Sequence, residues 1–168
     1  MTAENSRDFP ISWEEIHRDS KALAWRLSDT HHWEGIIAIT RGGMVPACII
    51  ARELNIRHIQ TLCIDTYDHK EKGEPHIINA PDIADGGRGW ILVDDLADTG
   101  TTLKVARKLY PHAHCACVYG KPAGINMVDT YITEVSQNTW IHFPWDLSFQ
   151  YSIPIANQRH ETQNNSGS

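Results

Sequence analysis

Residues 90–102 place an apolar strand, two aspartates and a turn of small residues in immediate succession. They read Trp90-Ile91-Leu92-Val93, then Asp94-Asp95-Leu96-Ala97, then Asp98-Thr99-Gly100-Thr101-Thr102. The residues that follow, 103–110, are typical of a helix. A strand that passes through a tight turn into a helix is the repeating unit of α/β domains. This segment therefore constrains the chain to an α/β fold in which a buried strand ends on acids.

The turn at 98–102 has the chemistry of a phosphate-binding loop. Gly100 lets the backbone approach an anion closely, and successive N–H groups and threonine hydroxyls can converge on one group of oxygens. The positive end of the following helix would point at the same anion. A strand that ends in an acidic, solvated turn without a ligand is the alternative interpretation.

The rest of the chain repeats the alternation of strand and helix. Helices are expected at 13–27, 45–54 and 99–110, and strands at 35–40, 58–65, 90–94, 114–120 and 130–136. Ser12 and Glu15 predict a capping box for the first helix, with Trp13, Ile16, Leu23 and Leu27 on its buried side. Residues 66–89 are expected to form a long loop with a short strand near 76–79. The pattern predicts a mostly parallel sheet.

Composition excludes several classes of function. A formal charge of -6 without a Lys/Arg-rich stripe argues against a nucleic-acid surface. The sequence shows no signal peptide and no apolar run of about 18 residues, so we expect a cytoplasmic protein. A peripheral position at the inner membrane stays open, although no basic amphipathic helix suggests it.

The four cysteines, at 48, 63, 115 and 117, are expected to be reduced thiols that are buried as small apolar residues. Cys115 and Cys117 share one face of the strand at 114–120, and alternation points His114 away from both. We therefore expect no metal site there.

Unusual polar groups follow the predicted strands at their carboxyl ends. They are Thr40-Arg41-Gly42-Gly43, Asp94-Asp95 and Gly120-Lys121. In open α/β sheets, ligands bind beyond the carboxyl ends of the strands, so these groups can surround one ligand. Because Asp94 and Asp95 are consecutive on an extended backbone, they should point to opposite sides and not chelate one metal as a pair.

These motifs resemble the phosphoribosyltransferase family, and the segment 90–102 resembles its binding motif for 5-phosphoribosyl 1-diphosphate (PRPP). The likeness is greatest to the bacterial enzymes for xanthine and guanine, and it rests on residues 37–46, 51–54, 56–58, 66–69, 121–124, 139–141 and 144–146. It covers residues 12–155 and implies the type I phosphoribosyltransferase fold, with a flexible lid loop at 66–89 and a short C-terminal hood at 137–155. Residues 1–11 are expected to be loose and 156–168 to be a disordered tail. The resemblance also implies a homotetramer.

The resemblance further implies roles for particular residues. PRPP and its phosphates would be bound by Arg41, Gly42, Lys72, Asp94, Asp95, Asp98, Thr99, Gly100, Thr101 and Thr102. The purine would be bound by Asp98, Lys121, Trp140 and Ile141, with Asp98 as the catalytic residue that exchanges a proton with N7. Mg²⁺ would be the cofactor, with Asp95 as its ligand and Asp94 as a second candidate. A cis peptide bond is implied between Thr40 and Arg41.

Two residues depart from the family pattern. Lys72 stands where the lid usually carries an arginine, and His142 stands where an acid usually follows the Trp-Ile pair. The first change replaces a bidentate cation by a point charge. The second puts an acid-mediated second metal contact in doubt.

The reaction that the resemblance implies is the Mg²⁺-dependent transfer of 5-phosphoribosyl from PRPP to N9 of xanthine or guanine, and less well of hypoxanthine. The products would be XMP or GMP and pyrophosphate, as in purine salvage, with no nucleic-acid partner. Two alternatives remain at this point: a non-catalytic regulatory protein that binds PRPP or a nucleotide, and a transferase for pyrimidines.

Overall fold

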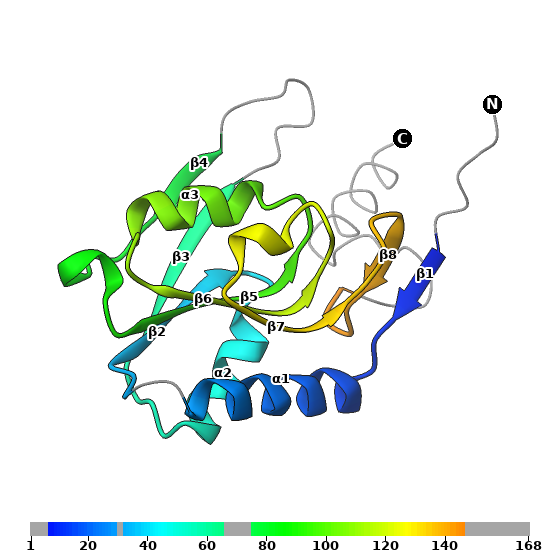
Figure 1. Ribbon diagram of the computed structural model, residues 1–168, viewed down its shortest axis with the longest axis horizontal. Coiled ribbons are helices and arrows are strands. Elements are labelled where there is room, and N and C mark those ends of the chain that lie inside the picture. The colour runs from blue at the N-terminus through cyan, green and yellow to red at the C-terminus, as the bar shows by residue number, and fades with distance from the viewer. Residues whose placement is uncertain (1–6, 30–31, 66–74, 147–168) are drawn as a thin grey trace, which may run out of the picture.

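The computed structural model describes residues 7–29, 32–65 and 75–146, and its centre is a six-stranded sheet (Figure 1). The strands lie in the order β4-β3-β2-β5-β6-β7. Their bounds are β2 (Gly35–Thr40), β3 (Ile59–Asp65), β4 (His76–Asn79), β5 (Trp90–Ala97), β6 (His114–Gly120) and β7 (Thr130–Glu134). Only β4 pairs in the antiparallel sense, with β3, among these described strands. The mostly parallel α/β sheet predicted from the sequence is confirmed.

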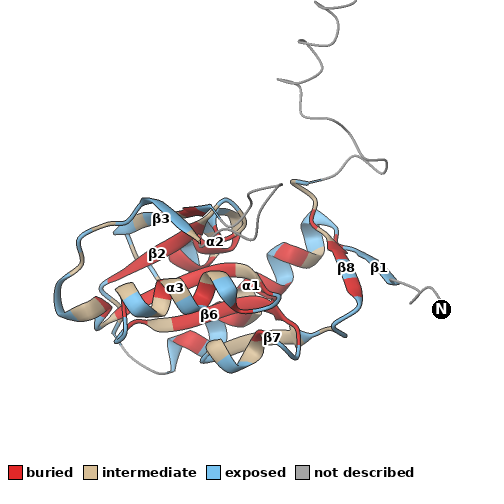
Figure 2. Ribbon diagram, turned by 90° about the horizontal axis from the view of Figure 1, so that it is seen from above, coloured by how far each residue is buried: buried red, intermediate tan, exposed pale blue. Residues whose placement is uncertain are grey.

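Helices cover both faces of the sheet (Figure 1). Helices α1 (Trp13–Ser28) and α2 (Met44–Glu53) lie on one face, and α3 (Thr101–Leu109) lies on the other. Short 3₁₀ helices, η1 (Ala84–Gly87) and η2 (Ile125–Met127), follow β4 and β6. Alternate residues of β5 serve the two layers: Ile91 and Val93 pack with α1 and α2, whereas Leu92 packs with α3. Figure 2 shows the buried residues concentrated in the central strands and the facing sides of the helices.

The ends of the helices follow from local chemistry. The Ser12 hydroxyl accepts a hydrogen bond from Glu15 N, and the Glu15 carboxylate accepts one from Ser12 N, which confirms the predicted capping box. The prediction that Trp13 is buried is wrong, since 56% of its surface is exposed. It stands at the first residue of α1, beside Trp145, with the ring centroids 6.0 Å apart. Asn55 has a φ of 53°, and this left-handed conformation ends the turn that follows α2.

A second, two-stranded sheet joins the two ends of the described chain. Strand β1 (Arg7–Pro10) pairs in parallel with β8 (Thr139–His142), and Ile11 N donates to His142 O at 2.9 Å. The expectation that residues 1–11 are loose is therefore wrong for 7–10. A side-chain contact also joins the two strands: His142 Nε2 of β8 lies 2.9 Å from Asp8 Oδ1 of β1. Of the expected hood at 137–155, residues 139–142 form β8, and residues 147–155 lie outside the described residues.

Other expectations meet the structure in part. The strand at 90–94 continues to Ala97, and α3 begins at Thr101 instead of residue 99, because Gly100 has a φ of 80° that a helix does not allow. His114 makes a contact of 2.8 Å with the Thr130 hydroxyl. The expectation of buried cysteines is confirmed for Cys115 and Cys117, but it is wrong for Cys48, which is exposed, and Cys63 is half-buried. The described residues contain no cluster of three or more metal-ligating side chains. Residues 66–74 of the expected lid and 147–168 lie outside the described residues.

In the described part of the chain, none of the helices has the length and apolar character needed to cross a membrane.

Candidate active site

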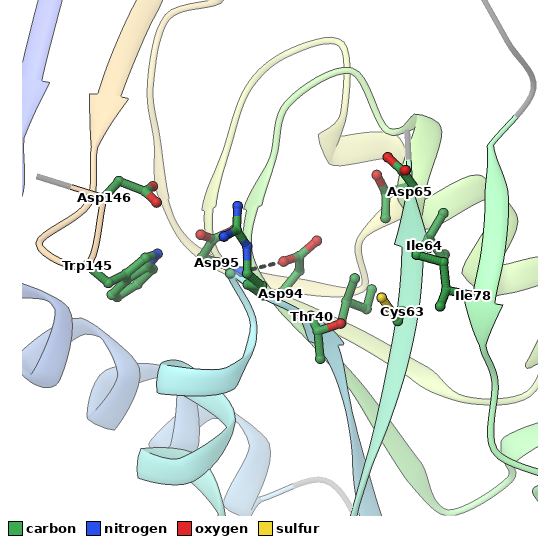
Figure 3. A pocket seen from close by; sticks show the side chains of 13 residues that line it. Thr40, Cys63, Ile64, Asp65, Ile78, Asp94, Asp95, Trp145 and Asp146 are labelled. Atoms are coloured by element: carbon green, nitrogen blue, oxygen red, sulfur yellow. Dashed lines mark hydrogen bonds between the residues drawn. The ribbon is translucent and has the colours of Figure 1, made fainter. Parts of the chain in front are cut away.

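An open pocket of about 460 Å³ lies beyond the carboxyl ends of β2 and β3 and against β5 (Figure 3). It is lined by Ile39, Thr40, Arg41, Gly42, Cys63, Ile64, Asp65, Ile78, Asp94, Asp95, Thr102, Trp145 and Asp146. The topology explains its position: β2 pairs with β5 only as far as the Ala38–Val93 pair. From Asp94 onward β5 keeps only β6 as a neighbour in the sheet, so its other edge opens into the pocket.

Asp94 and Asp95 both line this pocket, although alternation on β5 gives them different surroundings. Asp94 is buried, whereas Asp95 is half-buried. Asp95 N donates to Asp94 Oδ1 at 2.9 Å. The expectation that the two carboxylates point to opposite sides is wrong: a hydrogen bond joins the two side chains, and both line the one pocket at the free edge of β5.

Burial disfavours the charged form of both carboxylates. It raises the pKa of Asp94 well above its ordinary value, and the neighbouring charge of Asp95 adds to this effect. Burial also raises the pKa of Asp95, from 3.8 to about 6, against hydrogen bonds from Asp94 and from the backbone of Leu96. Two acids held in this way favour a bound cation, which would offset the cost of their charge.

The turn after β2 brings the Arg41 guanidinium and the backbone of Gly42 to the same pocket. The Thr40–Arg41 peptide bond is cis, which confirms the expectation from the family resemblance. Gly42 packs directly against Asp95: a Cβ atom at position 42 would lie 2.3 Å from Asp95 Oδ2. Glycine is therefore required there, because any side chain would displace the carboxylate. Arg41 is exposed at the pocket wall.

Asp146 adds a further carboxylate that sequence reasoning did not assign to the site. It lies with Trp145 on the side of the pocket away from Cys63 and Asp65 (Figure 3). Desolvation raises the pKa of Asp146, and the charge of Arg41 opposes that rise. The sequence indicates the segment 144–146 only through the family resemblance. No local pattern indicates that Asp146 approaches Arg41 and Asp95, since its place depends on the path of the chain after β8.

The turn at 98–102 forms a small cradle of about 70 Å³ beside the main pocket. Its walls are residues 96–103, and Thr102 lines both spaces. Gly100 turns the chain in the left-handed conformation, and the Thr99 and Thr101 hydroxyl oxygens are 3.0 Å apart. The open N–H groups at the start of α3 make this cradle suited to a phosphate.

Lys121 and Asp98 form an ion pair next to this cradle. Lys121 Nζ lies 3.1 Å from Asp98 Oδ1. Lys121 is only 5% exposed, whereas about half of the Asp98 side chain is open to solvent. Gln137 Nε2 donates to the same Asp98 oxygen at 3.2 Å. The sequence singled out Lys121 and Asp98 separately, and the fold brings them into direct contact.

The two remaining residues expected at the base lie in β8. Trp140 is 63% exposed, so its ring is available for stacking. Ile141 is buried in the core with Phe143. Only the backbone of Ile141 therefore remains for a ligand contact, and both roles stay predictions. Lys72 lies outside the described residues.

Comparisons with known proteins agree with this geometry. A family model described as a phosphoribosyl transferase domain matches residues 12–152. A xanthine-guanine phosphoribosyltransferase of Desulfotalea psychrophila is 58% identical over 92% of this chain and 96% of its own. One of the same name from Cereibacter sphaeroides is 51% identical, covering 89% of this chain and 93% of its own. The crystal structure of a purine phosphoribosyltransferase from Pyrococcus horikoshii aligns with a TM-score of 0.73 at 28% identity, covering 87% of this chain and 98% of that one.

Proposed function

Since the chain belongs to the phosphoribosyltransferase family and is an enzyme of purine salvage, we propose that it transfers the 5-phosphoribosyl group of PRPP to N9 of xanthine or guanine. Hypoxanthine is the poorer acceptor, and the products are XMP or GMP and pyrophosphate. One observation carries the proposal. The carboxylate pocket and the phosphate cradle share Thr102, and the Lys121–Asp98 pair lies beside them, so a sugar phosphate and a base fit side by side.

PRPP spans the two spaces in this proposal. Its 5-phosphate takes the backbone N–H groups and hydroxyls of the turn at 98–102, where the start of α3 adds a favourable dipole. The ribose hydroxyls donate to Asp94 and Asp95 at the free edge of β5. The diphosphate lies against Arg41 and the backbone of Gly42, which leaves room because it has no side chain.

The acids of the pocket fit a magnesium ion. Mg²⁺ typically takes one or two carboxylates together with substrate phosphate oxygens, and Asp95 with Asp94 would hold it here. The raised pKa of both acids supports the assignment, because a cation stabilises neighbouring carboxylates that are partly removed from water. When bound, the ion would neutralise charge on the departing pyrophosphate.

The base lies between Lys121, Asp98 and Trp140. Lys121 donates to the 6-oxo group, a role that suits a buried ammonium held at a strand end. Asp98 exchanges a proton with N7 while N9 attacks the anomeric carbon, which passes through an oxocarbenium-like state. Trp140 stacks on the ring. The protein acts mainly by holding both reactants in line and by countering charge.

The names of the relatives support xanthine and guanine as acceptors. The contact of Lys121 with Asp98 supports an oxopurine, because a purine carries its 6-oxo group beside N7, whereas a pyrimidine has no N7. The homotetramer, the cytoplasmic location and the role of Lys72 stay predictions.

Initial rates with xanthine, guanine and hypoxanthine, in the presence of PRPP and Mg²⁺, test the proposal. We expect nucleotide formation with all three bases and the lowest kcat/KM with hypoxanthine. Asp98→Asn should lower kcat by about 10²–10⁴-fold while PRPP affinity, measured by calorimetry, is kept. Asp29→Asn, an exposed change at the end of α1, is the matched control. If no base is turned over although PRPP binds, the alternative of a non-catalytic regulatory protein would be favoured.

A further inference from the structure

Gln137 is the only residue besides Lys121 that, in the described part of the chain, donates a side-chain hydrogen bond to Asp98. We infer that Gln137 is a positioning residue for the reaction: it fixes the orientation of the Asp98 carboxylate toward the purine. This inference rests on the proposed function. Nothing in the sequence patterns marked Gln137, because it lies 39 residues from Asp98 in a polar turn.

The contacts of Gln137 form a clamp between two loops. Its Nε2 donates to Asp98 Oδ1 at 3.2 Å, and its Oε1 accepts from Ala123 N at 2.9 Å. Both ends of the amide are therefore engaged, which fixes which end faces Asp98. The loop that Gln137 holds at Ala123 is the one that begins with Lys121, the residue expected at the 6-oxo group.

Both donors to Asp98 use the same oxygen. Lys121 Nζ and Gln137 Nε2 each lie near Oδ1, at 3.1 and 3.2 Å. Within the described residues, Oδ2 accepts no hydrogen bond. The carboxylate is thus oriented with one oxygen held by the protein and the other open, and the open oxygen is the one that can meet the N7 proton.

Gln137 matters most when the base is bound. About half of the Asp98 side chain is exposed, and it lies in a turn, so it depends on side-chain contacts for its orientation. In the proposed complex, Lys121 turns its ammonium toward the purine oxygen. Gln137 then remains as the protein contact that holds Asp98. Because Gln137 is neutral, it does so without cancelling the charge that Asp98 needs as a base.

The turn that carries Gln137 is itself well defined. The Ser136 and Thr139 hydroxyls are 2.6 Å apart, and Thr139 N donates to Ser136 O at 3.0 Å. The same turn leads into β8 and to Trp140. One short segment therefore sets both the acid and the stacking ring relative to the base.

Steady-state kinetics of Gln137→Ala test this inference against wild type. Gln137 is exposed, so its replacement should leave folding intact. We expect kcat with guanine to fall by about tenfold, as for loss of one hydrogen bond to a charged group, with KM for PRPP unchanged. Asn138→Ala, an exposed neighbour in the same turn, is the matched control and should behave as wild type.

Gln137→Glu separates positioning from simple support of the loop. Glutamate keeps an oxygen that can accept from Ala123 N but replaces the donor toward Asp98 by a second negative charge. If Gln137 acts on Asp98, kcat falls at least as far as in Gln137→Ala. A Gln137→Glu enzyme with wild-type kcat would overturn the inference, because only the loop contact would then matter.

A double-mutant cycle with Asp98→Ala completes the test. In that background, Gln137→Ala should have no further effect on kcat, since the group through which it acts has gone. An equal loss in both backgrounds, or wild-type kinetics for Gln137→Ala in an active enzyme, overturns the inference but leaves the proposed function standing. A wild-type protein that is inactive with every oxopurine overturns both.

Discussion

The Asp95 carboxylate lies in a half-buried position beside other acids, so the fold holds it at a cost in stability. We expect Asp95→Asn to make the ligand-free protein more stable at neutral pH and to abolish nucleotide formation. Asparagine has nearly the shape of aspartate, so the contact with Gly42 is kept. Its amide oxygen can still accept the hydrogen bond from the backbone of Leu96. What the substitution removes is the charge.

The pKa of Asp95 gives the size of the effect. A rise from 3.8 to about 6 corresponds to about 3 kcal/mol at 1.36 kcal/mol per pKa unit. Because Asp95 keeps part of its surface in water, screening reduces this to roughly 1–2 kcal/mol. For a chain of this length, that is an increase in Tm of roughly 2–8 °C. The loss of the Asp95 charge also eases ionisation of Asp94, whose pKa that charge raises.

The sign of the pH dependence follows from the raised pKa. Between about pH 4 and pH 6 the folded protein keeps a proton on Asp95 that the unfolded chain has released. The free energy of unfolding of the wild type therefore receives a contribution from Asp95 that is lost as pH rises through about 6. Asparagine does not titrate, so the stability gap between variant and wild type should widen from pH 4 to pH 7 and then level off.

Thermal unfolding followed by circular dichroism, over about pH 4 to 8 without divalent cations, measures this gap. Asp29→Asn serves as the control and should show no such widening. Mg²⁺ with pyrophosphate should then raise the Tm of the wild type more than that of Asp95→Asn, because it binds the charged acids of the folded state. A gap that is constant with pH, or a variant less stable than wild type at pH 7, would refute the reasoning.

Two other substitutions test the packing of the site and of the core behind it. Gly42→Ala should weaken PRPP binding by at least about tenfold, since its Cβ would meet the Asp95 carboxylate at 2.3 Å. Unchanged affinity by calorimetry would contradict that. Tyr119→Phe removes the hydroxyl that donates to buried Asp19 at 2.5 Å and ties β6 to α1. It should cost about 1–3 kcal/mol in urea unfolding and leave kcat unchanged. A Tyr119→Phe variant with wild-type stability but no activity would contradict this, because the Tyr119–Asp19 hydrogen bond would then support the active site and not the core.

The sequence was informative where structure depends on near neighbours. The uninterrupted apolar run of β2, the capping box at Ser12 and the glycine turn before α3 are all short-range features. Each was predicted from residues within one turn or one strand, and each is found. The order of strand, acids and phosphate turn at 90–102 likewise needs only local chemistry to be recognised, and it indicated the family.

Long-range pairing was beyond such reasoning. Residues 7–10 carry no clear pattern, so the sequence predicts no strand there. They form β1 because β8, more than 130 residues away, supplies the hydrogen bonds. The position of Asp146 in the pocket is likewise set by the path of the chain after β8. Trp13 follows the apolar spacing of α1 but lies at its first turn, where the core no longer covers it.

By itself, the sequence determined an α/β chain with phosphate-binding and acidic groups at the carboxyl ends of its strands, because strand alternation, helix capping and turn chemistry act over a few residues. Only the tertiary structure decided how these groups meet. It brought Asp94 and Asp95 to one pocket at the free edge of β5, and it joined Asp98 to Lys121 and Gln137. Those contacts depend on where separate strands end in space, which no local pattern encodes.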